Sequence, residues 1–186
     1  MGPLLLILIP GTIWVTGNLL LGAVVARTVF SHAPAPMAAV GPDQISRAMA
    51  GQLFGDALQM WYGVPLSIAC VAVCIGLGWL GGRAKAAGKP LTTAALIMAF
   101  VALTLLHTQT VAVVKTVGSQ AQELRTLTGP ELEERRVAFQ QAHHASENLV
   151  KLETLVVLAL VIGATIAAGR RRTVAALGSS APATPA

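Results

Sequence analysis

Long apolar runs without charged side chains are the main pattern of the chain. A transmembrane helix needs about 20 predominantly apolar residues, and the chain has four runs of this kind. The first has no Lys or Arg before it and is longer than the core of a signal peptide, so we expect it to be retained as a span. The pattern predicts four membrane-spanning helices. They are expected over residues 3–26, 57–82, 90–114 and 150–169.

The fourth run differs from the others because it carries charge. Lys151 and Glu153 lie at its start. Charged side chains near a helix end can extend toward the lipid headgroups while their apolar stems stay in the hydrocarbon. On this interpretation both side chains lie at the membrane boundary and the span is kept.

The segment between the first two spans contains a second pattern. Residues 31–42 are rich in Pro and Ala, which is typical of a loop. Apolar residues then recur at helical spacing, at Ile45, Met49 and Leu53. This spacing predicts a short amphipathic helix over residues 43–56 that continues into the second span.

A helix start precedes the fourth span by a long distance. Residues 128–131, Thr-Gly-Pro-Glu, combine an early Pro with a Glu in the first turn. No helix breaker follows before Gly163, so we predict one long helix that starts in water and enters the membrane near Leu149. Residues 1–172 are expected to form a single four-span domain. Residues 173–186 are small and contain Pro, and we predict a disordered tail there.

The predicted fold class is an all-α membrane protein. It is a four-helix transmembrane bundle with a short amphipathic helix between spans one and two and a long fourth helix. Two tryptophans of the second span, Trp61 and Trp79, lie eighteen residues apart, roughly 27 Å along a helix. This separation predicts that they mark the two membrane interfaces, as aromatic residues often do.

Composition supports the same class. Apolar residues make up 54% of the chain and charged residues 11%, and the mean hydropathy is +0.68. Soluble domains carry roughly 25% charged residues, so the surface is expected to face lipid. The net charge is +5, but the basic residues are not interleaved with aromatic ones, which argues against a nucleic-acid surface.

The distribution of charge predicts an orientation. The connection between spans two and three, residues 83–89, has three basic residues and no acid, and residues 170–172 are all Arg. Four spans place both segments on the same side of the membrane. Short basic segments mark the cytoplasm, so we predict a multi-pass protein of the cell membrane with both termini inside. Residues 28–56 and 115–149 would face the other compartment.

Polar residues inside the spans are the first candidates for a site. Asn18 in span one and His107 and Gln109 in span three are predicted at comparable depth, in the outer half of the bundle. Tyr62, Lys151 and Glu153 are expected in the same half. One interpretation is a small polar cavity that takes a ligand. The alternative is that each polar group bonds a neighbouring helix and only supports packing.

A second set of candidates precedes span four. Phe139, His143 and Ser146 form one stripe on a helix, and Asn148 follows. His143 also lies four residues before Glu147 and can share a metal with it, but zinc takes three or four ligands. We therefore predict no metal site here.

Other cofactor chemistry finds little support in the chain. His107 with His143 or His144 is the conceivable axial pair for haem, but the predicted spans place them at different heights, and no C-x-x-C-H motif is present. Cys70 and Cys74 are expected to be small buried residues. No G-x-S-x-G, H-E-x-x-H, Walker A or dinucleotide fingerprint appears. We predict no cofactor and no enzyme activity.

Three segments resemble a known family. They are Ile13 to Gly17, Ala50 to Gly55, and the stripe Phe139, His143 and Ser146 followed by Asn148. In order and spacing they resemble the transmembrane protein 205-like family, small four-span proteins known in bacteria largely as a domain of unknown function. The resemblance covers about residues 10–168. It implies a fold and a membrane location, but no reaction.

Three functions remain open at this point. The leading hypothesis is a non-enzymatic membrane protein whose Phe139–His143–Ser146 stripe packs on the 43–56 helix and stabilises the fold or an interface with a membrane-protein partner or a second copy. The second is a small transporter or ligand-binding protein that uses Asn18, His107 and Gln109. The third is a metal or haem carrier that uses its histidines.

Overall fold

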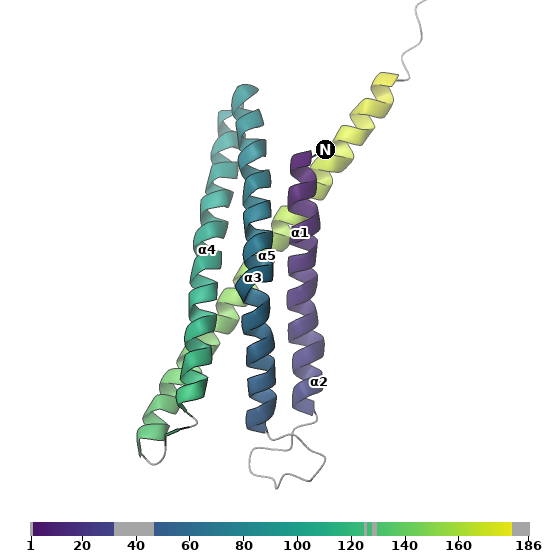
Figure 1. Cartoon of the computed structure of the whole chain (residues 1–186). Coiled ribbons are helices and arrows are strands. Elements are labelled where there is room, and N and C mark those ends of the chain that lie inside the picture. The colour runs from purple at the N-terminus through teal and green to yellow at the C-terminus, as the bar shows by residue number, and fades with distance from the viewer. Residues whose placement is uncertain (1, 32–46, 125, 128–129, 180–186) are drawn as a thin grey trace, which may run out of the picture.

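The computed structural model describes residues 2–31, 47–124, 126–127 and 130–179, and all regular structure in these residues is helical (Figure 1). The all-α prediction is therefore confirmed. The elements are α1 (Gly2–Leu19), a π-helical segment η1 (Leu20–Val25), α2 (Ala26–Ser31), α3 (Arg47–Ala86), α4 (Pro90–Glu123) and α5 (Pro130–Ser179).

Four helices are long and apolar enough to cross a membrane. They are Gly2–Ser31, which joins α1, η1 and α2, then Met49–Ala86, Pro90–Glu123 and Pro130–Arg170. Their length and composition indicate a multi-pass membrane protein, as the apolar runs predicted. The predicted amphipathic helix continues into the second span without a break, because residues 47–56 are the first part of α3. Residues 43–46 lie outside the described part.

The last helix is longer than the sequence pattern predicted. α5 is 50 residues long and ends at Ser179, so the prediction of a disordered tail is wrong for residues 173–179. These residues include Ala and Leu, which favour helix, and the next Pro is Pro182. A run of small residues therefore does not by itself predict a tail without helix. Residues 180–186 lie outside the described part.

A tight turn joins α3 to α4. Gly88 adopts a φ of +66°, which lies in the left-handed region that glycine occupies without strain. Its N–H donates to the carbonyl oxygen of Lys85 at 3.0 Å, and the Lys89 N–H donates to that of Ala84 at 3.0 Å. Pro90 then starts α4, at a helix position that needs no N–H donor.

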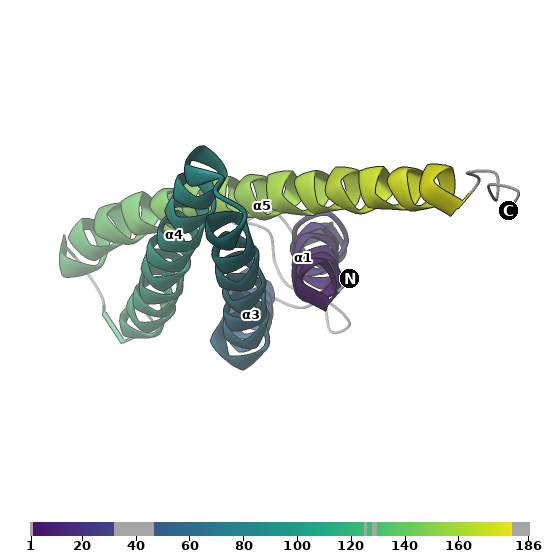
Figure 2. The ribbon, with the colours of Figure 1, turned by 90° about the horizontal axis from the view of Figure 1, so that it is seen from above.

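Three helices pack side by side, and the fourth crosses two of them. α3 lies between α1 and α4, and α5 runs obliquely across α4 and α1 behind them (Figure 2). The N-terminus, the α3–α4 turn and the C-terminal part of α5 lie toward one end of the molecule (Figure 1). This end therefore carries the basic connection 83–89, and we refer to it as the basic end.

The core is a column of buried side chains along the bundle. Large apolar residues elsewhere, such as Met60, Leu91 and Met98, are exposed on the outer faces, as expected for helices that face lipid. Because lipid is as apolar as these side chains, close packing and interhelical hydrogen bonds must hold the helices together. The largest fully buried apolar side chains are Trp14, Tyr62, Leu66, Val73, Leu77, Leu103 and Val157.

Candidate functional site

A hydrogen-bonded pair of ionisable residues lies in the interior of the bundle. His107 Nδ1 of α4 is 2.8 Å from Glu153 Oε1 of α5. Glu153 is fully buried, and His107 is 7% exposed. The prediction that Glu153 extends to the lipid headgroups is therefore wrong. Residue 153 lies near the middle of the long, oblique α5, and its side chain faces α4 rather than a membrane boundary.

The other helices contribute neighbours to His107. Ser67 Oγ of α3 is 3.3 Å from His107 Nε2. The indole ring of Trp14, from α1, meets the imidazole edge-on, with ring centroids 5.1 Å apart and an interplanar angle of 71°. Both Trp14 and the imidazole are thereby held in place, and all four spanning helices meet at this pair.

The hydrogen bonds around His107 determine how many protons the pair holds. Ser67 Oγ donates to the Gly63 carbonyl oxygen at 2.6 Å, so it accepts from His107 Nε2, which must carry a proton. Nδ1 then faces Glu153 Oε1, and two acceptors would repel each other. One proton must lie between them, on either atom. The pair is therefore neutral as a unit, whichever of the two atoms holds the proton.

The cluster retains unused hydrogen-bonding capacity. Glu153 Oε2 and Trp14 Nε1 are both buried and have no hydrogen-bond partner among the described residues. The hydroxyl group of Tyr62, also buried, lies beside the same carboxyl group. A buried polar atom without a partner is expensive. The centre of the bundle thus offers the Trp14 N–H as a donor to a small polar ligand, and Glu153 Oε2 as an acceptor for which the Tyr62 hydroxyl group can compete.

Asn18 links three helices next to this pair. Its Nδ2 donates to the Tyr62 hydroxyl oxygen at 3.1 Å and to Thr154 Oγ1 at 2.8 Å, and its Oδ1 accepts from Trp61 Nε1 at 2.9 Å. The polar atom of Trp61, which is predicted to mark a membrane interface, is thus satisfied by Asn18, whereas Trp79 is 52% exposed.

The structure brings together two of the three predicted cavity residues. Asn18 and His107 both face the segment of α5 that contains Glu153 and Thr154. Gln109 is exposed, because two residues along a helix turn a side chain about 200° away. The sequence did not predict Trp14, Ser67 or Thr154 as members of this cluster. It placed Glu153 in the outer half of the bundle, near the membrane boundary. The signal in the sequence that could have identified the pair is a carboxylate inside an apolar run.

The Phe139–His143–Ser146 stripe is organised mainly within α5. The rings of Phe139 and His143 stack with centroids 5.8 Å apart, and Ser146 Oγ donates to the His143 carbonyl oxygen at 2.8 Å. Asn148 is exposed. Since α5 packs on α4 and α1 and hardly meets α3, the predicted packing of this stripe on the 43–56 helix is wrong for residues 47–56.

The described residues do not assemble a histidine-based metal centre. No three His, Cys, Asp or Glu side chains among them converge as metal ligands do. His143 instead lies 3.4 Å from Glu147, which is 3.5 Å from Lys151. His143 also precedes Glu153 by ten residues on one helix, roughly 15 Å, so it does not face His107 as an axial haem ligand would.

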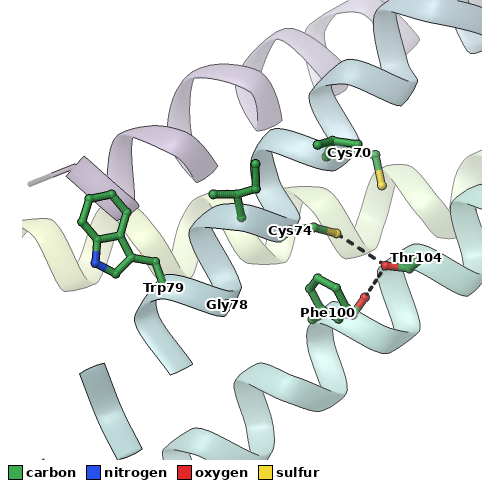
Figure 3. A pocket seen from close by; sticks show the side chains of 8 residues that line it. Cys70, Cys74, Gly78, Trp79, Phe100 and Thr104 are labelled. Carbon is green, nitrogen blue, oxygen red and sulfur yellow. Dashed lines mark hydrogen bonds between the residues drawn. The ribbon is translucent and has the colours of Figure 1, made fainter. Parts of the chain in front are cut away.

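The two cysteines line a groove between α3 and α4. Figure 3 shows Cys70 and Cys74 on the side of α3 that faces Thr104, whose Oγ1 is 3.5 Å from Cys74 Sγ. Both thiols are free and buried, as predicted. The groove has a volume of about 630 Å³ and is otherwise apolar, with Phe100 beside Thr104 and Trp79 at its other end.

Replacing Asn18 by leucine should weaken the contact of α1 with α3 and α5. The change leaves Trp61 Nε1 without its acceptor and removes both donations to the neighbouring helices. We expect a loss of about 1–2 kcal/mol in the free energy of unfolding, the upper range for interhelical hydrogen bonds in membranes. Unfolding by SDS in mixed micelles measures it. Thr16→Leu, an exposed polar position on the same helix, is the control and should change stability by less than about 0.5 kcal/mol.

Comparisons with protein-family models, with curated proteins and with solved structures find no match to this chain.

Proposed function

We propose that this protein is a non-enzymatic membrane protein of the small transporter or ligand-binding class, and that the proton shared by His107 and Glu153 takes part in its activity. The observation that carries the proposal is the complete burial of the Glu153 carboxyl group, 2.8 Å from His107 Nδ1, where the four spanning helices meet. Ionisable residues inside membrane bundles are costly and typically belong to proton or substrate pathways.

A purely structural role explains the pair less well. Hydrogen bonds between membrane helices contribute about 0.6 kcal/mol on average. Buried ion pairs can often be replaced by apolar residues of similar volume without loss of stability, or with a gain of about 1–4 kcal/mol. Packing alone therefore does not explain why two ionisable residues lie in the interior of the bundle. Their presence is explained if the shared proton exchanges when a ligand binds at Glu153 Oε2 and Trp14 Nε1.

Few other titratable groups face the pair. From α3, Tyr62 and Cys70 lie within electrostatic reach of the Glu153 carboxyl group, and Cys74 lies within reach of His107. α1 has no ionisable side chain in its sequence. A response of the bundle centre to pH can therefore be assigned with few variants.

Membership in the transmembrane protein 205-like family and cytoplasmic termini are parts of the same proposal. The family resemblance is supported by the position of Phe139, His143 and Ser146 ahead of the membrane-embedded part of α5. The orientation is supported by the basic end, which combines residues 83–89 with Arg170. On this orientation the stripe lies on the non-cytoplasmic side.

Infrared difference spectroscopy tests the shared proton directly. Spectra of the protein in lipid vesicles at acid and alkaline pH should contain coupled bands of a buried carboxyl and an imidazole group. The carboxyl band should disappear in Glu153→Gln and the imidazole band in His107→Gln. In each variant the remaining band should shift, because the two side chains no longer share a proton.

The control for this experiment is Glu147→Gln. Glu147 is an exposed carboxylate of the same helix, paired with His143 and Lys151, so its removal should leave the buried bands unchanged. A carboxyl band that persists in Glu153→Gln would contradict the proposal. So would a wild-type protein whose carboxyl bands do not respond to pH. Tyr62→Phe separates the contribution of the neighbouring phenol.

A further inference from the structure

A second cavity lies at the basic end of the bundle, away from the His107–Glu153 pair. It has a volume of about 460 Å³, within the range of roughly 300–1,000 Å³ that is usual for small-molecule sites. Each spanning helix contributes an apolar side chain to its floor. These are Leu4 of α1, Leu77 of α3, Leu96 of α4 and Leu160 of α5.

The shape of the cavity follows from small residues on α5. Gly163, Ala164 and Ala167 form its wall on that helix, where larger side chains would fill the space between the helices. A Cβ atom on Gly163 would meet no neighbour within 4 Å. α5 also diverges from α4 toward the basic end (Figure 1). The result is an apolar groove that is open at the side and at the end of the bundle.

Two cationic side chains line this groove at the basic end. Arg83, near the end of α3, and Lys89, just before α4, both line it and are exposed. The segment 83–89 contains no acid, and Glu153, the acidic residue of the fourth span, is bonded to His107. Neither cation forms an ion pair with a side chain in the described part of the chain. Positive charge above an apolar groove is complementary to an amphiphilic anion.

We propose that this groove binds an anionic glycerophospholipid. Its phosphate would lie between Arg83 and Lys89, and one acyl chain would lie on the leucines of the floor. Basic pockets between membrane helices on the cytoplasmic side bind acidic headgroups in this way. A soluble phosphate could use the two cations, but it would leave the apolar floor exposed, so the lipid is the occupant that fits both parts of the site.

Native mass spectrometry of the full-length protein, released from micelles that contain phosphatidylglycerol or phosphatidylcholine with identical acyl chains, tests the proposal. We expect the protein to retain phosphatidylglycerol in preference to phosphatidylcholine. Arg83→Gln and Lys89→Gln should each weaken retention about fivefold, and the double variant about 30-fold, since one basic residue near a membrane surface contributes about 1 kcal/mol.

Lys85→Gln is the matched control for charge. Lys85 belongs to the same segment and is exposed, but it does not line the groove, so its loss should change retention less than twofold. An effect of Lys85→Gln as large as that of Arg83→Gln would overturn the proposal in favour of unspecific surface attraction. Equal retention of the two lipids by the wild type would also overturn it.

Filling the groove tests the apolar part separately. Gly163→Leu keeps both cations and places a side chain in the space of the acyl chain, and it should reduce retention of phosphatidylglycerol at least tenfold. Gly169→Leu is the control, because a Cβ there also meets no neighbour and Gly169 is outside the groove. Unchanged retention in Gly163→Leu would contradict the site. Inorganic phosphate that competes fully with the lipid would show that only the cations bind.

Discussion

Glu153→Leu is expected to lower the free energy of unfolding by about 2–4 kcal/mol. This lies between the effect of a neutral interhelical hydrogen bond, about 1 kcal/mol, and that of a stranded buried charge, about 3–5 kcal/mol. The variant leaves His107 Nδ1 buried without its partner at 2.8 Å. SDS unfolding in mixed micelles measures the change.

The double variant His107→Leu/Glu153→Leu is the decisive comparison. It removes both polar groups, so its free energy of unfolding should lie within about 1 kcal/mol of the wild-type value or above it. Gln109→Leu serves as the control for adding a leucine to α4 at an exposed position, with a change below about 0.5 kcal/mol. A double variant as unstable as Glu153→Leu would mean that the pair holds the bundle together, which would support a structural role.

The stability cycle and the infrared experiment address different properties. The cycle asks whether the pair is needed for the fold, and the spectra ask whether its proton exchanges. A stable double variant that has lost the carboxyl and imidazole bands would separate function from folding. The pair would then be retained for a reason other than stability, as expected of a proton-linked site.

Much of the fold follows from the period and length of the apolar runs. The runs predicted the four helices because a bilayer demands about 20 apolar residues for each span. Gly88 and Pro90 mark the end of one helix and the start of the next by local backbone chemistry alone. The end of α5 was missed, since composition over residues 173–179 does not separate a helix of small residues from a tail.

The central site was only partly predictable. The burial of Asn18 and His107 near one another follows from their similar depth in two spans, but their common partners on α5 depend on its oblique path across α4 and α1. Tilt is set by packing between helices, which a hydropathy pattern does not contain. For the same reason the pattern placed Glu153 at the membrane boundary rather than in the interior of the bundle.

Gly17→Ala is expected to have the second large effect, about 2–3 kcal/mol of lost stability. A Cβ at residue 17 would overlap the indole ring of Trp61, a rigid group that has no flexible end to move aside. The ring would have to shift and give up its hydrogen bond to Asn18 Oδ1. Overpacking contributes about 1–3 kcal/mol, and the lost interhelical bond adds about 0.6 kcal/mol. Thermal melting in detergent and SDS unfolding both measure the loss.

A compensating change distinguishes this explanation from a general effect of alanine. Gly22→Ala, in the same helical rod and with no neighbour within 4 Å of the added Cβ, should leave stability unchanged or raise it slightly, because alanine favours helix more than glycine does. Trp61→Leu should be destabilising alone, but it should remove most of the effect of Gly17→Ala in the double variant. If the two losses simply add, the glycine is not required for the approach of Trp61 to α1, and the contact between α1 and α3 must depend on other residues.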